Sequence, residues 1–161
     1  MVFDIIKELK PSWRGEYEIT DTIRLMMRKG YRIGHSIIEG WWFDTGKKDD
    51  ILQVNSIILD ETIKREIKGE VINSRIDGRV TIMEETKIVD STVRGPCIIG
   101  KNCIIENSYI GPYTSIGDNT KIVGSSIEYS IVLKGATIEG IDRLEESLIG
   151  ENAKLIKVSK R

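Results

Sequence analysis

Aliphatic residues recur every seventeen positions through the second half of the chain, and this repeat predicts its architecture. Three such series interleave, separated by steps of five, six and six residues. They are Val71, Ile88, Ile105 and Ile122; Ile76, Val93, Ile110 and Ile127; and Ile82, Ile99, Ile116 and, one residue early, Val132. A repeat this short is typical of a solenoid, in which each unit buries its apolar row against the next.

The positions between these series predict a narrow interior with tight corners. Most six-residue steps carry a small side chain four positions after the aliphatic residue: Thr86, Cys97, Cys103, Thr114, Thr120, Ala136 and Ala153. Asn102, Asn119 and Asn152 immediately precede three of them, and asparagine tolerates the positive φ of a sharp corner. We therefore expect the small residues to be buried and the asparagines to lie at corners. The five-residue sides add a serine series at Ser74, Ser91, Ser108 and Ser125.

Residues 1–68 follow a different pattern. Residues 3–9 indicate the end of a helix, and Thr20 or Asp21 can cap a second helix that ends at Gly30. Residues 31–39 predict a strand, residues 49–59 a third helix, and residues 61–69 a link to the solenoid. Three short helices and one strand are too few for an independent α/β core, which predicts the tail of a larger domain.

Composition narrows the possible partners and location. The 161 residues carry 24 basic and 25 acidic side chains, so no bulk charge favours nucleic acid. No apolar run reaches the ~20 residues of a membrane span, and the first residues do not resemble a secretion signal, so we expect a cytoplasmic protein. The two cysteines, Cys97 and Cys103, occupy small inward positions and are expected to be buried hydrophobic groups rather than metal ligands.

Two kinds of motif carry a resemblance to known families. The segments that start at Ile99, Ile116 and Ile149 (IGKNC, IGDNT and IGENA) resemble the hexapeptide repeat of left-handed parallel β-helices. This resemblance, rather than the spacing, implies the left hand. It gives a mainly β fold with a β-helix of about five coils over residues 69–161.

The segment Lys10–Asp21 (KPSWRGEYEITD), followed by Trp41–Gly46 (WWFDTG), resembles the C-terminal part of the catalytic domain of sugar-phosphate nucleotidylyltransferases. The nearest resemblance is to the long form of the glucose-1-phosphate thymidylyltransferases, in which a left-handed β-helix follows that domain. Residues 1–68 would then be the remnant of the catalytic domain. The family joins a sugar 1-phosphate to a nucleoside triphosphate and releases pyrophosphate.

The resemblance implies roles for three residues. Asp44 matches the family's metal-binding aspartate, an oxygen ligand suited to Mg²⁺. Arg14 matches an arginine that faces the sugar phosphate, where a planar guanidinium can hold two oxygens. Glu16 is expected to help line the sugar side. No residue of the chain is assigned as a catalytic residue.

The family's glycine-rich nucleotide-binding signature, G-x-G-x-R, is missing from these residues. We therefore expect a truncated product that is inactive alone. An assembly or regulatory module without catalysis is one alternative, in which outward apolar residues such as Val89, Tyr109, Val123 and Tyr129 form a trimer or a regulatory subunit. A hexapeptide-repeat acyltransferase is another, disfavoured because the only histidine, His35, precedes the β-helix. We also expect the chain to form a homo-oligomer, a trimer or dimer, through β-helix faces that bury Val123, Tyr129 and Leu133.

Overall fold

The computed structural model describes residues 2–158, which form two compact units divided between Trp42 and Phe43. The first unit contains helices α1 (Val2–Ile6) and α2 (Ile19–Arg28), which pack through the buried side chains of Ile5 and Met26. Both helices were predicted. Thr20 and Asp21, however, lie inside α2, and the residue before its first turn is Glu18.

The strand predicted over residues 31–39 is not present, and these residues form no helix or strand. A strand needs a neighbour that pairs with its backbone N–H and C=O groups, and within the described part of the first unit there is none. The apolar side chains of the segment are consequently left in solvent, with Ile37 86% exposed.

Helix α3 (Lys48–Thr62) opens the second unit, where the sequence predicted a helix. Its N-terminus is held by the Asp50 carboxylate, which accepts a hydrogen bond from the Lys47 backbone N–H at 3.1 Å. The Asn55 side chain ties the helix to the coils: its amide donates to the Tyr113 carbonyl at 3.0 Å and its oxygen accepts from the Ser115 hydroxyl at 2.6 Å.

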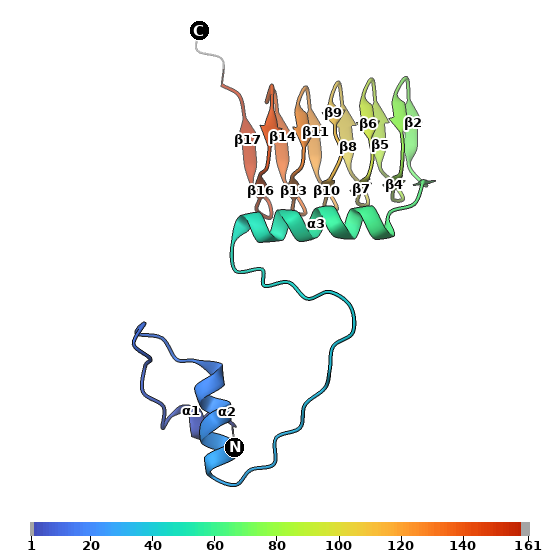
Figure 1. The fold of residues 1–161 in the computed structure, drawn as a ribbon. Helices are drawn as coiled ribbons and strands as arrows, with labels where there is room; N and C mark the ends of the chain where they lie inside the picture. Colours follow the sequence, from blue (N-terminus) through green and yellow to red (C-terminus); the bar gives the residue numbers. More distant parts are fainter. Residues whose placement is uncertain (1, 159–161) are drawn as a thin grey trace. The chain divides into compact units, whose positions relative to one another are not determined.

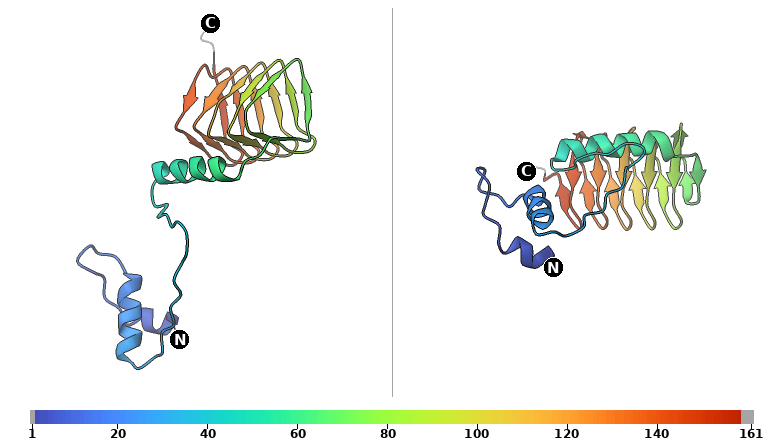
Figure 2. Two further views of the ribbon diagram at one scale, coloured as in Figure 1. Left: turned by 45° about the vertical axis from the view of Figure 1, so that its right-hand side comes forward. Right: turned by 60° about the horizontal axis from the view of Figure 1, so that its bottom comes forward.

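The rest of the second unit is a parallel β-helix of short strands stacked in three sheets (Figures 1 and 2). Sheet A contains β1 (Glu66–Ile67), β4 (Val80–Ile82), β7 (Cys97–Ile99), β10 (Thr114–Ile116), β13 (Ile131–Val132) and β16 (Leu148–Ile149). Sheet B contains β2 (Glu70–Ile72), β5 (Lys87–Val89), β8 (Ile104–Glu106), β11 (Lys121–Val123), β14 (Thr137–Glu139) and β17 (Lys154–Ile156). Sheet C contains β3 (Arg75–Asp77), β6 (Thr92–Arg94), β9 (Tyr109–Ile110), β12 (Ser126–Glu128) and β15 (Leu144–Glu145).

Strand pairing follows the predicted register. Ile88 pairs with Ile105, Ile105 with Ile122, and Ile122 with Ile138, so each aliphatic series forms one column. The link between α3 and the coils is shorter than predicted, because α3 continues to Thr62 and β1 already pairs with β4. Figure 1 shows α3 lying across the coils beside sheet A.

The interior and the corners also match the prediction. Thr86, Cys97, Cys103, Thr114, Thr120 and Ala136 are at most 1% exposed. Ala153 is only partly buried, because among the described residues no further coil stacks on the one that contains it. The corner asparagines Asn102, Asn119 and Asn152 have φ values of 51°, 58° and 56°.

The serine series forms a continuous hydrogen-bonded ladder. The hydroxyl oxygens of Ser74, Ser91 and Ser108 accept from the backbone N–H of the serine one coil further on, at 2.9, 3.0 and 3.1 Å. Each of these serines thereby accepts a hydrogen bond from a backbone N–H at the corner. Leaving such a buried donor unpaired would cost ~1–3 kcal/mol.

The outward apolar patch predicted from Val123, Tyr129 and Leu133 does not form. Val123 ends β11 in sheet B, Tyr129 lies between β12 and β13, and Leu133 follows β13 in sheet A. Tyr129 stacks instead on Tyr113, with ring centroids 5.2 Å apart. Within residues 2–158, no helix has the length and apolar content needed to cross a membrane.

Adjacent residues of β8 allow the packing of the interior to be tested. We expect Ile105→Ala to lower the free energy of unfolding by ~2–5 kcal/mol, because the lost side chain leaves a cavity in a closely packed column. Ile104→Ala is the control, since that side chain points outward and is 41% exposed. Chemical denaturation of both variants measures the difference, and equal losses would contradict the inward register.

The cysteines provide a second test. Burial raises the pKa of the Cys97 thiol to about 12 and also raises the pKa of Cys103. At pH 8 about one Cys97 thiol in ten thousand is then ionised, so we expect almost no reaction with a thiol reagent until the coils open. Absorbance with a disulfide reagent, in native buffer and in denaturant, checks this, and rapid native labelling would show that the interior is accessible.

Candidate functional site

The loop between α1 and α2 carries two of the three predicted site residues, Arg14 and Glu16. Its shape is set by backbone hydrogen bonds, since the Ser12 N–H donates to the Glu16 carbonyl at 2.8 Å and the Gly15 N–H to the Ser12 carbonyl at 2.9 Å. Gly15 has a φ of 78°, a value that favours glycine. Arg14 and Glu16 flank Gly15 in this loop, and both are exposed.

Arg14 is held by an acidic neighbour. Its Nη2 and Nε atoms donate to Glu18 Oε1 at 2.8 and 3.2 Å, and the Ser12 hydroxyl donates to the same oxygen at 3.1 Å. The hydrogen bonds from Arg14, followed by that from Ser12, hold the pKa of the Glu18 carboxyl below its usual value. The guanidinium keeps donors directed at solvent, since its side chain is 53% exposed.

Glu18 is a residue whose role the sequence reasoning missed. It precedes the first turn of α2, as a helix-start group should, but makes no side-chain cap bond. Its carboxylate orients Arg14 instead. The sequence carried no clear signal for this contact, because residues 14–18 are not helical and the i,i+4 rule for side-chain pairs applies only within a helix.

Asp44 lies in the segment that leads into α3, and its carboxylate is exposed. One carboxylate oxygen would be 3.6 Å from a Cβ added at Gly46, so the carboxylate bends back over that glycine. Arg14 and Glu16 thus share one loop of the first unit, whereas Asp44 belongs to the second. The structure therefore describes the loop with Arg14 and Glu16 and the segment with Asp44 separately, each within its own unit.

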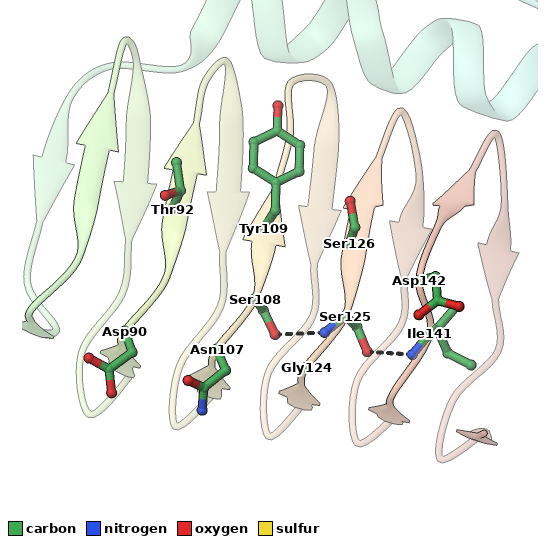
Figure 3. A pocket seen from close by; sticks show the side chains of 10 residues that line it. All are labelled: Asp90, Thr92, Asn107, Ser108, Tyr109, Gly124, Ser125, Ser126, Ile141 and Asp142. Carbon is green, nitrogen blue, oxygen red and sulfur yellow. Dashed lines mark hydrogen bonds between the residues drawn. The ribbon is translucent and has the colours of Figure 1, made fainter. Parts of the chain in front are cut away.

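The coils carry a groove of their own, about 590 Å³, along the corner between sheets B and C (Figure 3). It opens where the corner column continues from Asn107 to Gly124, which adds no side chain. Its acidic groups already have partners: Asp90 accepts from Asn73, and Asp142 pairs with Lys157. The remaining polar lining consists of hydroxyl and amide groups, among them those of Thr92, Tyr109 and Asn107.

The comparisons with known proteins agree with both halves of the structure. Residues 1–61 match the family model described as "Nucleotidyl transferase", and the β-helix follows directly. The chain is 42% identical over 155 residues to a glucose-1-phosphate thymidylyltransferase of Streptomyces antibioticus, covering 96% of this chain and 43% of the relative.

Two archaeal proteins give similar matches. The low-salt glycan biosynthesis nucleotidyltransferase Agl11 of Haloferax volcanii is 42% identical, over 96% of this chain and 44% of its own length. A bifunctional sugar-1-phosphate nucleotidylyltransferase/acetyltransferase of Sulfurisphaera tokodaii is 36% identical, over 94% of this chain and 38% of its own length.

The chain therefore resembles the β-helix class of nucleotidyl transferases, as its motifs predicted. More particularly, it is similar to a glucose-1-phosphate thymidylyltransferase, and it spans about two fifths of the length of the curated relatives it matches. The family model ends at residue 61, and the predicted division between residues 68 and 69 stays a prediction.

The contact between Arg14 and Glu18 can be tested by titration. We expect Arg14→Gln to raise the pKa of the Glu18 carboxyl toward its ordinary value, because the largest stabiliser of the ionised form is lost. Arg24→Gln is the control, since Arg24 pairs with Asp21. Carboxyl ¹³C chemical shifts followed against pH measure both variants, and an unchanged Glu18 titration in Arg14→Gln would contradict the pairing.

Proposed function

We propose that this chain provides the sugar-phosphate side of a sugar-1-phosphate nucleotidylyltransferase, which makes a nucleoside diphosphate sugar and releases pyrophosphate. The match of residues 1–61 to the nucleotidyl transferase family carries the proposal. Its support is that both Arg14 and Asp44, which correspond to phosphate- and metal-binding positions, lie within that match. We place the activity in the cytoplasm, where nucleoside triphosphates are available.

In this proposal Arg14 binds the phosphate of the sugar 1-phosphate. The guanidinium is exposed, and Glu18 already restricts its rotation, so little side-chain freedom is lost when the phosphate arrives. A phosphate oxygen takes the donors that face solvent, while Glu18 keeps the others. Glu16, on the same loop, would accept hydrogen bonds from sugar hydroxyls.

Asp44 would hold Mg²⁺ in the complete site. Among residues 2–158 no group of three or more histidine, cysteine, aspartate or glutamate side chains could form a metal cage. One exposed carboxylate still fits Mg²⁺, which commonly binds through one or two carboxylates together with substrate phosphates and water. When bound, the ion screens the phosphate charge that otherwise repels the attacking oxygen.

The exposed apolar residues of the first unit support a larger catalytic domain. Phe3, Trp13 and Ile37 are 78%, 95% and 86% exposed, and Trp41 and Trp42 are 49% and 72% exposed. Large apolar side chains left in solvent in this number are unusual for a complete domain and support a surface that binds another protein part. We propose that they contact a nucleotide-binding part that carries the glycine-rich loop.

The name of the Sulfurisphaera tokodaii relative includes an acetyltransferase activity. We do not extend it to this chain, because an acyl transfer of this type uses a histidine base and His35 lies outside the coils. Assembly through the β-helix is compatible with the nucleotidylyltransferase function, and we propose that this chain forms homo-oligomers.

The proposal predicts how turnover depends on the nucleotide-binding part. The purified 161-residue chain, given nucleoside triphosphate, sugar 1-phosphate and Mg²⁺, should release no pyrophosphate in a coupled assay. Adding the complementary N-terminal part of the Streptomyces antibioticus relative should produce turnover. Turnover by the chain alone would contradict the proposal that the triphosphate site lies elsewhere.

Matched variants test the assigned residues in the complemented enzyme. We expect Asp44→Asn and Arg14→Gln each to lower kcat/KM at least ~100-fold, since each removes a charge that acts on phosphate. Asp49→Asn and Arg24→Gln are the controls, because these residues form ion pairs with Lys48 and Asp21. Equal losses in variants and controls would show that the assignment is wrong.

A further inference from the structure

The groove at the corner between sheets B and C exists because a column of side chains stops there. Each coil turns this corner through one residue with a positive φ, between 45° and 69°. In chain order these residues are Asn73, Asp90, Asn107, Gly124 and Gly140. The first three carry a side chain and the last two have none. The column therefore ends at Asn107, and the side chain that Gly124 lacks leaves the space of the groove.

Two serines of the ladder form the floor of the groove. The Ser108 hydroxyl donates to the Glu106 carbonyl at 2.6 Å and accepts from the Ser125 N–H at 3.1 Å. The Ser125 hydroxyl donates to the Val123 carbonyl at 2.9 Å and accepts from the Ile141 N–H at 3.1 Å. Both serines are buried. The coil backbone thus holds the floor in one arrangement, and little order has to be gained when a ligand arrives.

Three other polar side chains of the groove have no hydrogen-bond partner among residues 2–158. They are the amide of Asn107 and the hydroxyls of Thr92 and Ser126. Figure 3 shows Thr92 and Ser126 on the strands that flank Tyr109, with Asn107 at the corner. Amide and hydroxyl groups together offer both donors and acceptors. They match a ligand that also donates and accepts at several points.

The charges of the groove oppose the binding of phosphate. Of its lining residues, only Asp90 and Asp142 are charged, and both are acidic. One oxygen of Asp90 accepts from Asn73, and one oxygen of Asp142 pairs with Lys157. The second oxygen of each carboxylate can accept a hydrogen bond from a ligand. Because like charges repel, this lining favours neutral hydroxyl groups over an anion.

Tyr109 adds an aromatic surface at the centre of the groove. Its half-buried side chain stands on β9, between Thr92 of β6 and Ser126 of β12. These strands lie ~4.8 Å apart, a distance that one pyranose ring spans. The negative face of an aromatic ring attracts C–H groups. A sugar ring beside Tyr109 can therefore pack its C–H groups there while its hydroxyls reach the neighbouring strands.

We propose that this groove binds a neutral saccharide of one or two pyranose rings. Its volume of about 590 Å³ lies within the range of small-molecule sites. Because the groove is open to solvent and offers few contacts, we expect a Kd of about 1–10 mM. The proposal does not rest on the nucleotidylyltransferase function, since it uses only residues of the β-helix.

Two-dimensional NMR of the ¹⁵N-labelled full chain tests the site. The probes are the methyl glycosides of glucose, galactose, mannose, rhamnose and N-acetylglucosamine, each added to about 50 mM. At least one should shift the side-chain amide signals of Asn107 and the backbone amide signals of Gly124 and Ser126. Shifts confined to the loop with Arg14 and Glu16 would instead report the proposed sugar-phosphate site, so the two proposals are tested separately.

Gly124→Asn closes the groove and preserves the corner. Asparagine already occupies this column at Asn73 and Asn107, and nothing lies within 4 Å of a Cβ added at Gly124. We expect Kd to rise at least ~10-fold, because the added side chain takes the space of the ligand. Gly30→Asn is the control, since Gly30 belongs to the first unit and has a φ of 82° and equally open surroundings.

Asn107→Gly removes the free amide. Glycine adopts the positive φ of this corner without strain, so the change isolates the loss of hydrogen bonds and should raise Kd at least ~5-fold. The matched control is Asn102→Gly, which removes an asparagine from the corner between sheets A and B. That variant should leave Kd unchanged.

Three results would overturn the proposal. They are unchanged groove signals with all five probes, equally tight binding by Gly124→Asn, and tighter binding of glucose 1-phosphate than of the neutral glycosides in the groove. The last result would indicate an anion site. Thermal unfolding of each variant confirms that the coils remain intact, so a change in Kd reports on the groove and not on folding.

Discussion

The vertical alignment of one coil on the next is the constraint on which the second unit depends. Its strands are only two or three residues long, and a strand of that length is stable only when both neighbours supply hydrogen bonds and the column beneath it is filled. Parallel pairing at an offset of seventeen residues meets both requirements at once, because it aligns backbone groups and places Ile88, Ile105 and Ile122 above one another. The small residues at the corners follow from the same narrow interior.

This constraint explains which features the sequence could predict. Because coils of nearly equal length stack on one another, equivalent residues recur at a regular spacing in the sequence. The columns, the corner asparagines and the serine ladder could therefore be predicted from residue types alone. The failed strand over residues 31–39 has no such local rule, because a strand depends on a partner that the chain does not supply. Two other predictions failed for related reasons. Full burial of Ala153 requires a further coil stacked on its own, and an outward patch that includes Val123 requires its members to lie on the same side of the coil.

The candidate site shows the same limit. Motifs identified Arg14 and Asp44, but they did not show that Glu18 holds the guanidinium, since that contact depends on where α2 begins. Asp44 stands four residues before α3, and α3 is fixed to the coils through Asn55. With 15 residues at ~1.5 Å each, the helix is ~22 Å long, about the length of five stacked coils. The segment that contains Asp44 is thereby joined to a helix, α3, that is fixed to the coils of the β-helix.

The three sides of the β-helix thus differ in their outward residues, although all three sheets contribute the same kind of aliphatic column to the interior. Sheet A is occupied by α3, and the paired lysines of sheet B lose both hydration and mobility if they are covered. On the side of sheet C the charges of Arg75 and Arg143 are matched by the neighbouring carboxylates of Asp77 and Glu145. One rigid stack therefore presents three chemically different sides, because the outward residues of each coil can change while the inward columns that hold the coils together stay the same.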